Sequence, residues 1–359
     1  MTAIADAVLP RRQDLSEQGL GVALLHLERG DLDTVRSSLA RAVAGGVSAG
    51  GNASLFHGAP ALEFVLNCAA RPDQGVRDAV DRIVAARLAA ARRRLASGAL
   101  PRLAEFDLIR GLSGLGALLL QRCVASPLLH EVLVYLVGLA RPFRIDGRDL
   151  PGWWTGTGPA EEEMPGGHGN NGVAHGIAGP LAVLSLAARQ GAQVPGQLDA
   201  IEVIARWLDR YGGHYWISRD HLADHGPTRP APARPSWCYG RLGVARAQQL
   251  AAIALGDPVA RVTAEDSVAH ALTDQAQLGL ITDAGLCHGW AGLLTVTRAV
   301  ADDSADPARF TPMIIDLQAC LVDGLDGLPK PGFMEGRAGA HLALGSTNAS
   351  GWTRALLIT

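Results

Sequence analysis

The sequence predicts an all-α protein, an α/α toroid of about seven inner and seven outer helices. Three observations predict this fold: a glycine unit that recurs along the chain, a nearly all-apolar run after each unit, and amphipathic segments between the runs. The chain is 48% hydrophobic, with 43 glycines and only 5% aromatic residues, which is typical of a folded Ala/Leu/Gly-rich protein. We expect a single domain over residues 1–359.

The recurring unit reads Gly-x-x-Gly and usually opens an Ala/Leu-rich helical run. Its five clear copies are residues 111–114, 176–179, 240–243, 289–292 and 336–339. Two degenerate copies precede them, Gly19-Leu20-Gly21 and His57-Gly58-Ala59-Pro60. The spacing of roughly 40 to 65 residues accommodates two helices and their connections.

Two kinds of helix follow from the hydrophobic pattern. Residues 198–211 carry apolar side chains, beginning with Leu198, on one face and charged side chains on the other, which predicts an outer helix. Residues 112–120 and 177–188 are apolar on nearly all sides, as expected of inner helices enclosed by other helices. Alternating inner and outer helices close the toroid.

Charge and cysteine content exclude several classes of protein. With 32 basic and 35 acidic residues, the net charge of −3 argues against a nucleic-acid partner. The basic cluster at residues 87–94 is interpreted as a solvated helix face. No signal peptide or long uncharged apolar run is present, so we expect a cytoplasmic protein that is not integral to the membrane. Five scattered cysteines, an odd number, disfavour a disulfide framework.

Polar and metal-binding residues stand before the glycine units, where helix N-termini would converge on one cavity. They are Asp107, His175, Cys238, Tyr239, Cys287 and His288. Two cysteines and a histidine suit a zinc site with three protein ligands and an open fourth position. The residues alone leave two interpretations of this set open, a zinc site and three core side chains. Asp107 likewise either faces the cavity or caps a helix.

Three segments resemble the signature motifs of the lanthionine synthetase C-like (LanC) family. They are Gly-Val-Ala-His-Gly-Ile-Ala-Gly at 172–179, Ser-Trp-Cys-Tyr-Gly at 236–240 and Gly-Leu-Cys-His-Gly-Trp-Ala-Gly at 285–292. In this order and spacing the motifs are highly specific, and the repeats extend the resemblance over essentially the whole chain. The resemblance implies a lanthionine cyclase domain over residues 1–359 with one zinc ion, held by Cys238, Cys287 and His288.

The resemblance also implies four active-site residues. His175 is the expected proton carrier, Asp107 would orient or charge it, and Arg234 would stabilise a developing oxyanion. A structural ion pair remains the alternative for Arg234, and Tyr239 either donates a hydrogen bond or packs. Trp237 is interpreted as packing. The chain departs from the family pattern at Leu242, where many relatives have proline, and it has no room for a sizeable inserted accessory domain.

The implied reaction is a Michael addition of a peptide cysteine thiolate to dehydroalanine or dehydrobutyrine, which closes a (methyl)lanthionine thioether ring. The expected partners are a dehydrated precursor peptide with leader and core, and a dehydratase and an exporter in a biosynthetic complex. A LanC-like zinc protein that binds peptide or glutathione without closing rings is the main alternative. The low content of aromatic residues disfavours a protein prenyltransferase β-type subunit. A toroidal glycoside hydrolase is disfavoured because only one carboxylate, that of Asp107, is expected in the cavity.

Other polar segments are interpreted as loops. These are the stretch with His214, His221 and His225, the acidic run 161–163, and residues 227–235. The loops could form a rim for peptide binding. His168 is expected at the mouth of the cavity.

Overall fold

The computed structural model describes residues 4–5, 13–17, 19–145, 147–223, 233–345 and 347–359. Its chain forms two compact units. The first comprises Met1–Val84 and Ile281–Thr359, and the second comprises Ala85–Leu280. The single domain expected from the sequence stays a prediction.

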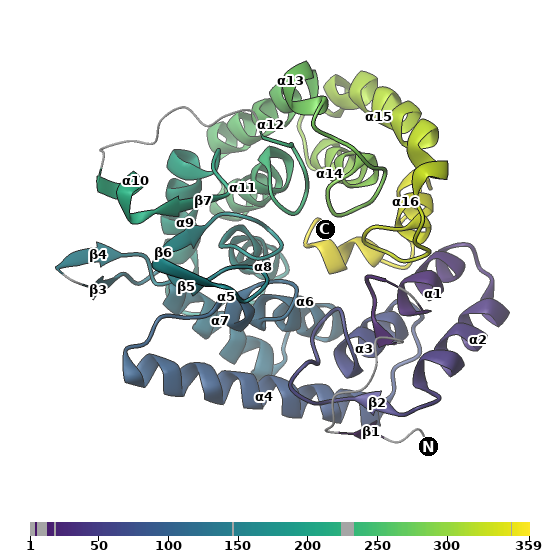
Figure 1. The fold of residues 1–359 in the computed structure, drawn as a ribbon, viewed down its shortest axis with the longest axis horizontal. Helices are drawn as coiled ribbons and strands as arrows, with labels where there is room; N and C mark the ends of the chain where they lie inside the picture. Colours follow the sequence, from purple (N-terminus) through teal and green to yellow (C-terminus); the bar gives the residue numbers. More distant parts are fainter. Residues whose placement is uncertain (1–3, 6–12, 18, 146, 224–232, 346) are drawn as a thin grey trace. The chain divides into compact units, whose positions relative to one another are not determined.

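In the first unit, α1 packs against α2, α3 and α16, and α14 packs against α15 and α16 (Figure 1). The helices are α1 (Gly19–Glu28), α2 (Leu32–Val43), α3 (Ala59–Cys68), α14 (Trp290–Asp302), α15 (Thr311–Gly324) and α16 (Arg337–Leu344), with 3-10 helices η2 (Pro307–Phe310), η3 (Leu325–Gly327) and η4 (Trp352–Leu356). Strands β1 (Ile4–Ala5) and β2 (Val47–Ser48) pair in parallel. Helix α4 (Gln74–Ser97) begins in this unit and continues into the second.

In the second unit, α8 packs between α6 and α11, and α7 and α9 pack together (Figure 1). The helices are α5 (Leu103–Phe106), α6 (Leu112–Arg122), α7 (Pro127–Leu139), α8 (Ala178–Arg189), α9 (Gln197–Tyr211), α10 (Arg219–Ala223), α11 (Arg241–Leu255), α12 (Pro258–Thr273) and α13 (Gln275–Leu278). The strands are β3 (Phe143–Ile145), β4 (Arg148–Leu150), β5 (Thr155–Thr157), β6 (Glu163–Asn170) and β7 (Trp216–Ser218).

Each predicted glycine unit lies at the start of a helix. The helices that begin there are α1, α3, α6, α8, α11, α14 and α16. In α6 and α8 every residue from Leu112 to Leu120 and from Ala178 to Ala187 is buried, as the all-apolar pattern predicts. The sequence therefore located the buried helices correctly.

Backbone packing explains the second glycine of the unit. Its N–H donates to a carbonyl seven residues earlier at Gly114, Gly243, Gly292 and Gly339, over 3.2–3.4 Å. A Cβ at Gly243 would lie 2.0 Å from the carbonyl oxygen of Trp237, and one at Gly339 would lie 1.8 Å from that of Phe333. Only glycine lets the preceding loop approach the helix this closely. The repeated unit is thus one repeated turn in front of a buried helix.

The amphipathic helix α9 covers the segment expected to be an outer helix, with one difference at its start. Ile201, Ile204 and Leu208 are buried as predicted. Leu198 is 42% exposed, and Ala200 is buried in the first turn instead. The apolar stripe therefore begins two residues later than the sequence pattern suggested.

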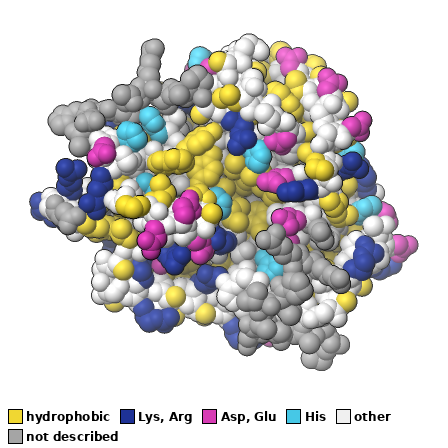
Figure 2. Space-filling view, viewed as in Figure 1, with side chains coloured by type: hydrophobic (Ala, Val, Ile, Leu, Met, Phe, Trp, Pro, Cys, Tyr) yellow, Lys and Arg dark blue, Asp and Glu magenta, His cyan; other side chains and the backbone are white. Residues whose placement is uncertain are grey.

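The sequence did not predict the strands. Strands β3 and β4 form an antiparallel hairpin, and the order β5-β6-β7 forms an antiparallel sheet. Exposed arginines Arg144 and Arg148 lie on the hairpin, where Figure 2 shows basic side chains gathered. Strand β6 contains three glycines, and such a strand has little intrinsic propensity, so pairing with its neighbours decides its conformation.

Two expectations about charged residues need correction. Arg94 in the basic cluster is not solvated: it pairs with Glu105 at 2.5 Å, and both side chains are less than one fifth exposed. Glu163 of the acidic run begins β6, so that run is not entirely loop. Among the described residues, no helix is both long and apolar enough to cross a membrane.

Candidate active site

Asp107 and His175 form a pair in the second unit. Asp107 Oδ2 lies 2.7 Å from His175 Nδ1, and the carboxylate is fully buried. The other oxygen, Oδ1, accepts hydrogen bonds from the backbone N–H groups of Arg110 at 2.7 Å and Gly111 at 2.8 Å, just before α6. One oxygen of Asp107 therefore binds the backbone before α6, and the other binds His175, while its place in a cavity stays a prediction. The carboxylate secures the start of a helix and orients the imidazole.

Tyr239 lies against the His175 ring. The two rings stack with centroids 6.2 Å apart and planes 25° from parallel. Asn170, at the end of β6, donates from Nδ2 to the Tyr239 hydroxyl at 2.9 Å. Burial raises the pKa of Tyr239, so the phenol stays neutral. Tyr239 therefore both packs and takes part in a hydrogen bond.

His168 lies on β6, the central strand of the β5-β6-β7 sheet, and its place at the mouth of a cavity stays a prediction. Its residue is 1% exposed, and its Nε2 lies 3.4 Å from Asn170 Nδ2. Burial lowers the pKa of His168 to about 4, so the imidazole is neutral near pH 7. No hydrogen-bond partner of its Nδ1 is found in the described part of the chain.

Cys238 is buried in the loop before α11. Its carbonyl accepts from the N–H groups of Val173 at 3.0 Å and Ala174 at 3.3 Å, which joins this loop to the one that carries His175. Gly240 has φ 151°, a conformation that side-chain-bearing residues rarely adopt, and this turns the chain into the helix. Backbone contacts therefore fix Cys238 relative to His175.

Arg234 hydrogen-bonds to Tyr215 through its backbone and its side chain. The Tyr215 ring in turn lies 5.4 Å from the Tyr239 ring, centroid to centroid. Burial raises the pKa of Tyr215, and the nearby Arg234 charge opposes the rise. The alternative role of Arg234 in a structural ion pair stays a prediction.

Cys287 and His288 lie in the first unit, in the loop before α14. The Cys287 N–H donates to the carbonyl of Met334 at 2.9 Å. His288 Nε2 lies 3.3 Å from Asp283 Oδ2, and each side chain is about one quarter exposed. A carboxylate at one ring nitrogen is the usual partner of an imidazole whose other nitrogen binds a metal. The surroundings of His288 therefore suit a ligand.

The sequence analysis missed Asn170 and Asp283. Each stands six residues before the first glycine of its unit, the position that Arg234 holds before Gly240. The candidate residues predicted from the sequence stand next to the glycines, except Asp107 and Arg234. Comparing the units six positions upstream would have identified both side chains.

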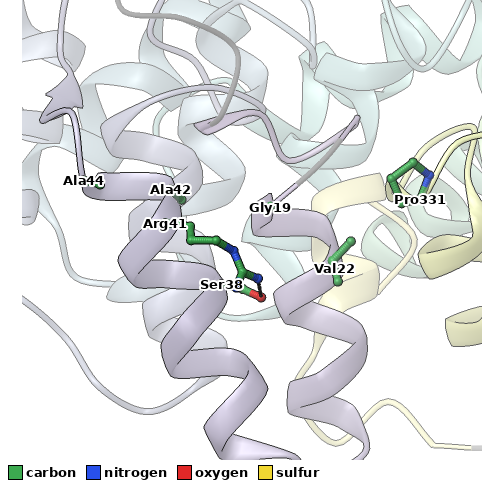
Figure 3. Close-up of a pocket in the computed structure, with 7 residues that line it drawn as sticks. All are labelled: Gly19, Val22, Ser38, Arg41, Ala42, Ala44 and Pro331. Atoms are coloured by element: carbon green, nitrogen blue, oxygen red, sulfur yellow. Dashed lines mark hydrogen bonds between the residues drawn. The ribbon is translucent and has the colours of Figure 1, made fainter.

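A cavity of about 550 Å³ lies elsewhere in the first unit (Figure 3). It is lined by α1, α2 and Pro331, and Arg41 donates to Ser38 Oγ across its wall at 3.1 Å. The pocket contains none of the residues predicted for catalysis or zinc binding. We do not assign the chemistry to it.

Part of the histidine-rich segment forms β7 and α10, so it is not entirely loop. His221 lies in α10, and its Nδ1 accepts from the backbone N–H of Ser218 at 3.1 Å. The His214 and His221 rings have centroids 5.7 Å apart. His225 and residues 227–232 lie outside the described residues.

Comparisons with known proteins identify relatives. The family model described as "Lanthionine synthetase C-like protein" matches residues 10–357. The chain is 25% identical to the nisin biosynthesis protein NisC of Lactococcus lactis subsp. lactis, over 71% of this chain and 64% of that protein's length, which is less than two thirds of it. The structure matches that of nisin cyclase with a TM-score of 0.78 and 21% identity, over 97% of this chain and 92% of the other. The likeness confirms the predicted fold class, an all-α α/α toroid.

Proposed function

Because the chain belongs to the lanthionine synthetase C-like family, we propose that it is a zinc-dependent peptide cyclase. It closes (methyl)lanthionine rings by adding a cysteine thiolate to dehydroalanine or dehydrobutyrine in a ribosomally synthesised peptide. The observation that carries the proposal is the pair of the buried Asp107 with His175, whose ring stacks on Tyr239 beside the loop of Cys238. In such a pair the carboxylate orients the imidazole and leaves its other ring nitrogen to exchange a proton with a substrate.

The proposed metal ligands are Cys238, Cys287 and His288, binding one zinc ion per chain. Two thiolates and an imidazole are soft donors that favour zinc, and three protein ligands leave one position for substrate. Zinc bound there would lower the pKa of a substrate cysteine thiol and keep the thiolate available as a nucleophile. The carboxylate of Asp283 beside His288 supports this ligand set from within the first unit.

His175 is the proposed general acid. Addition of sulfur to the β-carbon moves the π electrons toward the carbonyl and forms an enolate, whose α-carbon must then take a proton. Asp107 at Nδ1 fixes the imidazole so that Nε2 exchanges the proton. His175 is about one fifth exposed, so the ring is accessible without being solvated on all sides.

Arg234 and Tyr239 complete the proposed site. The Arg234 guanidinium would stabilise the enolate oxygen, because a preorganised cation costs no reorganisation when the charge develops. Tyr215 holds Arg234 in place. Tyr239 would support the His175 ring by stacking, since Asn170 already binds its hydroxyl.

The proposal also includes a substrate, two partner proteins and a cellular location. The substrate is a dehydrated precursor peptide with a leader and a core. A dehydratase supplies the dehydroamino acids, an exporter removes the product, and the reaction takes place in the cytoplasm.

The first experiment measures zinc content and consumption of free thiol on a dehydrated, cysteine-containing peptide. About one zinc per chain and metal-dependent thiol loss at unchanged peptide mass are expected. Cys287→Ala should lose both, whereas Cys123→Ala, which changes an exposed cysteine outside the ligand set, should keep both. Wild-type protein without zinc would overturn the mechanism. Zinc without thiol loss would favour a family member that binds peptide or glutathione without closing rings.

A further inference from the structure

Asp283 is held in place by its own loop. Its Oδ1 accepts from the N–H of Gly285 at 2.7 Å, and its carbonyl accepts from the N–H of Trp290 at 3.1 Å. The second carboxylate oxygen, Oδ2, is directed to His288 Nε2 at 3.3 Å. The backbone therefore fixes one oxygen and leaves the other to the imidazole.

Two glycines make room for this carboxylate. A Cβ at Gly285 would lie 3.0 Å from Asp283 Oδ1, and a Cβ at Gly289 would lie 2.4 Å from it. Any larger residue at Gly289 would push the carboxylate aside or bend the loop. The space around Asp283 Oδ1 is thus part of the turn that precedes α14.

The equivalent position in the turn before α16 also carries a side chain that reaches across the turn. Six residues before Gly336, Lys330 pairs with Glu335 at 2.6 Å. Asp283, six residues before Gly289, pairs with His288 in the same way. In both turns the residue six before the glycine contacts the residue immediately before it. These two turns share this contact, and only before α14 is the contacted residue a histidine.

From this geometry we infer that Asp283 is a positioning residue for His288 as a zinc ligand, an inference that rests on the proposed function. Asp283 Oδ2 accepts a hydrogen bond from the Nε2–H group of the imidazole and thereby selects the tautomer that presents Nδ1 to the metal. An anionic partner also makes the imidazole a better electron donor. Asp283 touches neither substrate nor reacting atoms, so it acts through His288.

The test is the zinc dissociation constant, measured by competition with a chromophoric chelator on the full chain. Asp283→Ala should weaken zinc binding by about 10-fold to 100-fold. Asp283→Asn should also weaken it, because its single amide oxygen can stay on the N–H of Gly285 only if its NH₂ group turns toward His288 Nε2. Because Asp283→Asn can keep the bond from Gly285, it serves if the alanine variant does not fold.

Two controls separate positioning from general electrostatics. Asp33→Asn changes a carboxylate that is 93% exposed in α2 of the same unit and should leave the dissociation constant unchanged. Glu335→Gln removes the charge of a carboxylate whose pKa is lowered chiefly by Lys330 and also by the charge of His288. It should have less effect than Asp283→Asn.

The outcomes distinguish this inference from the proposed function. Wild-type zinc affinity in both Asp283 variants, or an equal loss in Glu335→Gln and Asp283→Asn, would overturn the role of Asp283 and leave the cyclase proposal standing. Wild-type protein that binds no zinc would overturn both. In cobalt-substituted protein, a changed visible absorption spectrum in Asp283→Ala is expected in addition, because the ligand field depends on how the imidazole is held.

Discussion

Asp107 binds the backbone before α6 with one carboxylate oxygen and His175 with the other. A substitution can therefore change one interaction and keep the other. Asp107→Asn can keep its amide oxygen on the N–H groups of Arg110 and Gly111, but it would turn an NH₂ group toward His175. We expect the rate of ring closure to fall on the order of 100-fold with zinc content unchanged. The measurement is thiol consumption at saturating peptide, with Asp33→Asn as control. Equal rates in wild type and Asp107→Asn would contradict the proposed role of the pair.

His168 is expected to make the protein sensitive to acid. Its pKa of about 4 in the folded chain lies below the ordinary 6.5, so the unfolded chain binds a proton more readily between these values. Stability is therefore full above about pH 6.5 and is lost as the pH falls toward 4, by about 2 kcal/mol at pH 5.

His168→Phe should remove this part of the pH dependence. Denaturant unfolding at pH 7.5 and pH 5 measures it, with the exposed His130→Asn as control. If wild type and His168→Phe lose the same free energy of unfolding between the two pH values, the buried imidazole is not responsible.

Among the helices, the repeated turn predicts opposite effects for two glycines. Gly243→Ala would place a Cβ 2.0 Å from the Trp237 carbonyl oxygen, so it should destabilise the protein by about 1–3 kcal/mol. Gly138→Ala, inside α7 and with no atom within 4 Å of the added Cβ, should stabilise it by about 0.5–1 kcal/mol. Chemical denaturation of both variants tests the pair. A stable Gly243→Ala would show that the turn does not depend on this close approach.

Some helices have a periodic signal in the sequence, whereas strand β6 has none. The sequence predicted α6 and α8 because their residues are nearly all apolar, and it predicted α9 because its apolar residues recur on one face. Strand β6, with its glycines and His168, has no such signal. Its conformation comes from hydrogen bonds to β5 and β7, which lie far from one another in sequence.

At the scale of the whole molecule, the proposed zinc ion is expected to stabilise the folded chain. A ligand that binds only the folded state adds about 2.7 kcal/mol when its free concentration is a hundred times its dissociation constant. Removal of zinc by a chelator should therefore lower the midpoint of thermal unfolding, and added zinc should restore it where added magnesium does not. An unchanged midpoint after verified loss of the metal would contradict a contribution of zinc to folding.

The sequence by itself determined the helical class, the starts of the buried helices, and the candidate residues around the glycine units. The period of apolar residues and the need for glycine in a tight turn both depend on residues close together in the chain, so they can be recognised from the sequence. Only the tertiary structure decided that Asp107 holds both a helix start and His175, that Asn170 binds Tyr239, and that Asp283 is directed to His288. These side chains meet only because the folded turns bring them together, and the conformation of the turns cannot be derived from the order of residues alone.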